Sequence, residues 1–156
     1  MRPLIPLLSL FLLLSGCLTP AAMREGEGAR TMGYAYLGEG NTPLAITEFK
    51  KAAKANRWDR DAWHGLGLAY FAAKRYPDAE ANLLKAIETS ATSFPQAELN
   101  LGSLYLETER WEEAIEHLRK ALEDPEYRQP AKAQHNLGWA LYNTAKYSEA
   151  RNEYVE

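Results

Sequence analysis

Small and large apolar residues recur along this chain in a fixed order, and the order repeats about every 34 residues. The most regular position is a glycine. A large apolar residue directly precedes it, and a second large apolar residue follows it three positions later. The glycines lie 34, 35 and 36 residues apart, and they are Gly33, Gly67, Gly102 and Gly138. Large apolar residues four positions apart share one face of a helix, so the pattern predicts a helix in each unit.

A second landmark lies twelve residues after each glycine. There an alanine is followed, four residues later, by a large side chain, as with Ala79 and Leu83. The other pairs are Ala45 with Phe49, Ala114 with Leu118, and Ala150 with Tyr154. We predict two antiparallel helices per unit. Glycine inside a helix costs about 1 kcal/mol relative to alanine, so its recurrence predicts close packing, and we expect the alanine of the second helix to face it.

The combined spacing resembles the tetratricopeptide repeat, a helical hairpin of 34 residues. The second unit fits best, with Trp63-x-x-Leu66-Gly67-x-x-Tyr70 followed by Ala79, Leu83 and Ala86. The resemblance implies an all-α, right-handed superhelical solenoid. The expected units are residues 26–59, 60–93, 95–128 and 131–156. The fourth unit lacks its last helical positions, so we expect the array to be truncated here or covered by a partner.

The front of the chain has the pattern of an export signal and a lipid anchor. Within residues 1–16, Arg2 precedes an apolar run that is too short to span a membrane. The sequence Leu14-Ser15-Gly16-Cys17 resembles the bacterial lipobox and holds the only cysteine. The resemblance implies cleavage before Cys17 and covalent lipid on its sulfur. The alternative is an ordinary secretory signal with an incidental cysteine.

Residues 17–28 are predicted to form the lipidated cysteine and a tether, because they are small, polar and contain proline and glycine. The alternative is that they begin the first helix. Several acyl chains hold a protein firmly in a bilayer, since each buried methylene contributes about 0.8 kcal/mol. Leu18 stands where an aspartate commonly retains lipoproteins in the inner membrane, so its presence implies a periplasm-facing position on the outer membrane.

Composition and charge exclude several functions. The net charge of -3 and the absence of a basic block give no reason to expect nucleic-acid binding. The three histidines, His64, His117 and His135, have no metal-ligand spacing. There is no phosphate-binding loop or nucleophile motif. We therefore expect no catalytic residues, no metal, no small-molecule substrate and no cofactor apart from the covalent lipid.

The first helices of such an array line its concave face, which we expect to bind a peptide segment of a protein partner. By repeat register the predicted groove residues are Arg30, Tyr34, Leu37, His64, Leu68, Phe71, Leu99, Asn100, Ser103, Leu106, His135, Asn136, Trp139 and Tyr142. The alternative is that some of them, especially Leu68 and Leu99, pack between repeats. The set lacks the asparagines of the carboxylate clamp that binds chaperone tails, since Tyr34 and Gly65 stand in their places.

A lipobox followed closely by these repeats resembles the pilotin lipoproteins of type IV pili, the PilF, PilW and Tgl family. The shared features are Cys17, Tyr36-Leu37-x-x-Gly40-Asn41 with Ala45, and the long junction before Asn136-Leu137-Gly138. The resemblance implies binding of an outer-membrane secretin segment and help with secretin assembly. The alternatives are a scaffold for other envelope complexes, such as peptidoglycan synthesis or outer-membrane assembly, and an enzyme whose catalytic domain lies beyond Glu156.

Overall fold

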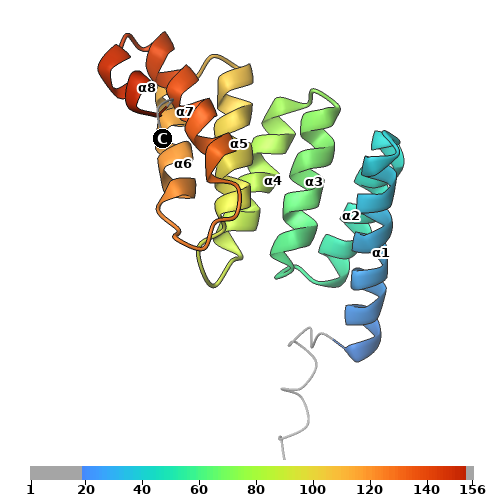
Figure 1. Ribbon diagram of the computed structural model, residues 1–156. Helices are drawn as coiled ribbons and strands as arrows, with labels where there is room; N and C mark the ends of the chain where they lie inside the picture. The colour runs from blue at the N-terminus through green and yellow to red at the C-terminus, as the bar shows by residue number, and fades with distance from the viewer. Residues whose placement is uncertain (1–18, 154–156) are drawn as a thin grey trace, which may run out of the picture.

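Residues 19–153 are described by the computed structural model, and within them all regular structure is α-helical. The helices follow one another in hairpins along the array (Figure 1). Their bounds are α1 (Pro20–Gly38), α2 (Thr42–Ala55), α3 (Arg60–Ala72), α4 (Tyr76–Glu88), α5 (Pro95–Glu107), α6 (Trp111–Leu122), α7 (Pro130–Asn143) and α8 (Tyr147–Glu153). None of the described helices is long and apolar enough to cross a bilayer.

The way the helices pack gives the array an inner and an outer face. Each helix packs against the next one in the chain, and α1, α3, α5 and α7 also contact one another in succession. Among the described residues the even-numbered helices make no such contact with each other. The odd-numbered helices therefore form the inner, concave face, and the even-numbered helices lie apart on the outer face. This confirms the prediction of an all-α solenoid.

The same turn closes all four hairpins. After α1 the backbone N–H of Asn41 donates to the carbonyl of Tyr36, and Gly40 between them has a φ of 73°. This is the Schellman arrangement, in which a left-handed residue ends the helix. The equivalent left-handed residues in the other hairpins are Lys74, Glu109 and Ala145. A common turn gives the hairpins a common geometry, which lets them stack.

The glycine of the first helix meets a different partner from the one expected. A Cβ on Gly33 would lie 2.8 Å from Cδ1 of Phe49, and a Cβ on Gly67 would lie 2.7 Å from Cγ of Leu83. Gly102 has the same relation to Leu118. The prediction that the alanine faces the glycine was wrong. The large side chain one helical turn after the alanine occupies the space that the missing side chain leaves.

The predicted tether over residues 17–28 was also wrong from residue 20 onward, because α1 begins at Pro20. Thr19 caps the helix, its Oγ1 accepting from the backbone N–H of Ala22 at 3.1 Å, and proline is favoured in the first turn. The alternative, that this segment begins the first helix, is correct. The export signal at 1–16, Cys17 and the end of the fourth unit at 154–156 lie outside the described residues.

Gly67→Ala is expected to lower the free energy of unfolding by up to about 2 kcal/mol. Overpacking costs ~1–3 kcal/mol, and alanine recovers about 1 kcal/mol of helix propensity. Leu83 cannot simply rotate away, because its backbone nitrogen would also lie 3.2 Å from the new Cβ. Denaturant unfolding followed by circular dichroism measures the change.

Gly28→Ala is the matched control, because Gly28 lies within α1 and a Cβ there would meet nothing within 4 Å. This variant should be more stable than wild type by up to about 1 kcal/mol. If both variants gained stability, the close approach of Gly67 to Leu83 would not constrain the hairpin.

Candidate functional site

The predicted groove residues all lie on the odd-numbered helices, but they differ in how open they are. Leu99 belongs to the core, as the alternative interpretation expected, and His64 is buried as well. Leu37, Phe71 and Leu106 are partly buried and pack against the core. These five side chains therefore hold the array together more than they face a partner. Leu68 and Asn100 are half-buried, whereas Tyr34, His135, Trp139 and Tyr142 are exposed.

A chain of hydrogen bonds centred on His64 crosses three helices of the concave face. Nε2 of His64 lies 2.8 Å from the amide nitrogen of Asn100 on α5, and Nδ1 lies 3.5 Å from the hydroxyl of Tyr34 on α1. The Tyr34 hydroxyl donates to the backbone carbonyl of Asp61 at 3.1 Å. Because an amide nitrogen can only donate, Nε2 accepts and the ring proton sits on Nδ1. Neutral His64 thus links the first three repeats.

Burial controls the protonation of this chain. It lowers the pKa of His64 from 6.5 to about 4, with Asp61 opposing the shift. The Tyr34 side chain is 39% exposed, but its remaining part is packed closely enough that desolvation raises the pKa of its hydroxyl to about 12, and the nearby Asp61 carboxylate adds to the effect. Both side chains are therefore uncharged at neutral pH, as their hydrogen bonds require.

Ser103 and Asn136 connect the third and fourth repeats in a similar way. The amide of Asn136 on α7 donates to Oγ of Ser103 on α5 at 3.0 Å. Ser103 in turn donates to the backbone carbonyl of Leu99 at 2.9 Å. These polar groove residues form hydrogen bonds between and within repeats, which leaves less of their hydrogen-bonding capacity for a partner.

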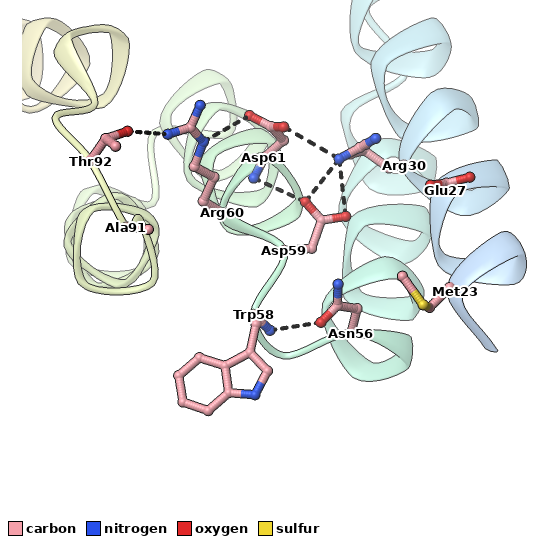
Figure 2. A pocket seen from close by; sticks show the side chains of 10 residues that line it. All are labelled: Met23, Glu27, Arg30, Asn56, Trp58, Asp59, Arg60, Asp61, Ala91 and Thr92. Carbon is pink, nitrogen blue, oxygen red and sulfur yellow. Dashed lines mark hydrogen bonds and ion pairs between the residues drawn. The ribbon is translucent and has the colours of Figure 1, made fainter. Parts of the chain in front are cut away.

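Arg30 also takes part in an internal network, at the edge of the concave face. Its Nη1 lies 2.9 Å from Oδ1 of Asp59 and 3.3 Å from Oδ2 of Asp61. Asp59 accepts from the backbone at the start of α3, so one carboxylate caps that helix and holds Arg30. Figure 2 shows Arg30 directed at both aspartates, with Arg60 reaching Thr92 on the other side.

This network borders a cavity of about 370 Å³ that Trp58, directed away from the charged residues in Figure 2, also lines. Arg60 donates to Oγ of Ser90 at 2.7 Å as well as contacting Thr92. Arg30 and Arg60 therefore join α1, α3 and the α4–α5 connection. The role that fits Arg30 is structural, because its charge is already balanced by two carboxylates.

The last described hairpin carries an exposed aromatic cluster of Trp139 and Tyr142 on α7 with Tyr147 at the start of α8, and these side chains are 50%, 55% and 60% exposed. The rings of Trp139 and Tyr142 are stacked with centroids 6.2 Å apart, and those of Tyr142 and Tyr147 meet at 63° with centroids 5.3 Å apart. Sequence register predicted the first two residues. Tyr147 begins α8, and only the fold brings its ring beside Tyr142.

The described residues offer no arrangement suited to metal binding. Within residues 19–153, no group of three or more histidine, cysteine, aspartate or glutamate side chains could hold a metal ion. His117 and Glu98 form a half-buried pair at 2.6 Å that joins α5 to α6. The pair bridges the two helices of one hairpin, so its position is that of a packing contact.

The buried state of His64 makes stability depend on pH. Between pH 6.5 and about 4 the unfolded chain binds a proton that the folded chain does not, so stability falls as the pH is lowered. The expected loss is on the order of 3 kcal/mol across this window. The variant His64→Gln keeps an acceptor for Asn100 but cannot gain a proton. In this variant the part of the pH dependence of stability that comes from His64 should vanish. Urea titrations at several pH values measure the free energy of unfolding of both proteins. An equal change of this free energy with pH in wild type and variant would contradict the argument.

Solved structures show the same fold. PilF of Pseudomonas aeruginosa matches with a TM-score of 0.79 and 23% identity, covering 86% of this chain and 60% of its own. PilW, a widely conserved type IV pilus biogenesis factor, matches with a TM-score of 0.75 and 20% identity, covering 82% and 58%. The first tetratricopeptide domain of Spaghetti (RPAP3), bound to an HSP90 peptide, matches with a TM-score of 0.72 and 21% identity, covering 79% and 95%. The chain thus spans about three fifths of the length of PilF and PilW.

Sequence comparison assigns the repeats directly. No curated protein sequence matches the chain. Two models of the tetratricopeptide repeat match it, one over residues 58–124 and the other over residues 99–156. Together they span more than half of the chain, and the first match contains the two complete hairpins from α3 to α6. The chain belongs to the tetratricopeptide-repeat family, and its fold is that of a protein-interaction scaffold.

Proposed function

We propose that this protein is an outer-membrane lipoprotein that binds a segment of a secretin and promotes assembly of the secretin ring, as a pilotin. The observation that carries the proposal is the lipobox-like Leu14-Ser15-Gly16-Cys17 placed directly ahead of the repeats. The likeness in fold to PilF and PilW supports it. A scaffold for another envelope complex is the competing function.

The position of α1 bears on how a lipid anchor would act. Cys17 precedes Pro20, the first residue of α1, by three residues, and an extended chain advances at most about 3.6 Å per residue. The start of the helix therefore lies within about 11 Å of the cysteine. Lipid on Cys17 would hold the start of α1 close to the membrane surface, where an outer-membrane partner has to be delivered.

The chemistry of the concave face indicates what kind of segment it would bind. Arg30, His64, Ser103 and Asn136 are engaged in contacts within the array. The aromatic cluster remains open, and apolar concave surfaces suit amphipathic peptide segments that bury a row of apolar side chains. We therefore expect the bound secretin segment to contribute apolar side chains to the cluster, with few charge-charge contacts.

The proposal predicts the state of the secretin in cells of the source bacterium. Deleting the gene should leave the secretin as monomers, and the wild-type gene should restore denaturation-resistant multimers in the outer membrane. Trp139→Ala combined with Tyr142→Ala should reduce the multimers at least several-fold, because aromatic residues dominate interface energetics. Cys17→Ser should release the protein from the membrane fraction and also reduce them. Immunoblots of fractionated membranes measure both effects.

Trp58→Ala is the matched control for the aromatic variants. Trp58 is 58% exposed, comparable to Tyr142, but it lies in the α2–α3 turn and its ring is directed away from Arg30, Asp59 and Asp61 (Figure 2). This variant should restore wild-type multimers. Secretin multimers that persist unchanged in the deletion strain would refute the pilotin role and favour the competing scaffold function.

A further inference from the structure

The outer face carries a pocket that the proposed function does not use. A cavity of about 460 Å³ opens between α2 and α4, two helices that do not touch each other, and α3 forms its floor. Its volume lies within the range of ligand-binding pockets. The lining residues are Lys50, Ala53, Lys54, Arg57, Trp63, Leu66, Tyr70 and Asn82.

The floor of this pocket is apolar and lies on a different side of α3 from the concave face. Trp63, Leu66 and Tyr70 are three and four residues apart, so they lie along one side of α3. Successive residues of a helix are turned by about 100°, which places His64 and Phe71 roughly a third of a circle away from that side. Leu66 and Tyr70 are 3% and 4% exposed. The apolar floor is therefore recessed, and Trp63 beside it is only partly buried.

The rim of the pocket is positively charged. Lys50 and Lys54 lie one turn apart on α2, and Arg57 follows in the α2–α3 turn. Within residues 19–153 none of the three forms an ion pair: Lys50 lies 5.8 Å from the centre of the Tyr70 ring and Arg57 lies 5.0 Å from that of Trp58. Like charges one turn apart destabilise a helix. The neighbouring Lys51, in contrast, is paired with Glu48.

We propose that this pocket binds an acidic peptide segment in which a large apolar side chain stands between carboxylates. The apolar side chain enters between Trp63 and Tyr70, and the carboxylates meet Lys50, Lys54 and Arg57. A protein segment fits better than a membrane surface, because insertion into a bilayer needs apolar side chains that project, and here they are recessed between charged ones. The site is separate from the concave face and does not depend on the lipid anchor or on a secretin partner.

Binding is tested with the full chain and a fluorescein-labelled peptide in which phenylalanine is flanked on both sides by glutamates. Lys50→Glu combined with Lys54→Glu should weaken binding about tenfold or more, because attraction becomes repulsion at two positions. The matched control is Lys132→Glu combined with Lys146→Glu, which changes the net charge equally at exposed sites on and after α7. The control should bind as wild type does.

Two further probes separate the pocket from general charge attraction. A peptide with serine in place of phenylalanine, and one with glutamines in place of the glutamates, should each bind at least several-fold more weakly. In a nitrogen-15 spectrum, the peptide should shift the indole signal of Trp63, whose Nε1 donates to the carbonyl of Arg57 at 2.8 Å, and leave that of Trp139 unchanged.

The proposal is overturned if both double variants bind alike, if the serine peptide binds as tightly as the phenylalanine peptide, or if the shift appears at Trp139. It is also overturned if vesicles of anionic lipid bind in a way that depends on Lys50 and Lys54 while the peptide does not bind. None of these results bears on the pilotin role, which concerns the concave face.

Discussion

Leu83 lies against the backbone of α3 at the point where Gly67 has no side chain. Phe49 fills the equivalent space beside Gly33 in the preceding hairpin. This contact sets how closely the two helices of a unit approach, and close packing leaves little freedom to vary that distance. Since all hairpins also share one closing turn, they stack with the first helices together and the second helices apart. Both faces of the protein follow from this arrangement.

The two faces then differ in chemistry. On the concave side, polar residues such as His64 and Asn100 join successive repeats, and the open surface that remains is aromatic around Trp139 and Tyr142. On the outer side, the separation of the second helices exposes a recessed apolar floor with lysine and arginine side chains at its rim. A single scaffold can therefore offer apolar recognition on one side and charge-assisted recognition on the other.

The repeats could be predicted because several positions recur together in four registers, and each recurrence constrains the next. The side chain that packs against each glycine could not be predicted. Spacing shows which residues share a face of a helix, but it does not show which of two residues one turn apart contacts the neighbouring helix. The start of α1 could have been predicted, because Thr19 is a helix-capping residue and Pro20 is favoured in the first turn of a helix. The small residues that follow them led instead to the prediction of a tether.

Pairings over long separations were beyond reach from a single sequence. Arg30 contacts Asp59 and Asp61, and His64 contacts Asn100, across separations of about one repeat that only the stacked hairpins bring together. For the same reason the outer pocket was missed: Lys50 and Lys54 resemble an ordinary solvated face of α2 until Trp63 and Tyr70 of the next repeat are placed beneath them.

The central claim, that the aromatic end of the concave face binds the secretin, is tested most directly by site-specific photocrosslinking in living cells. A photoreactive phenylalanine analogue replaces Tyr142 on α7 or, for comparison, Leu84, an exposed apolar residue on the even-numbered helix α4. The account predicts a covalent adduct with the secretin from position 142 and none from position 84. A secretin adduct from position 84 alone, or from neither position, would contradict it.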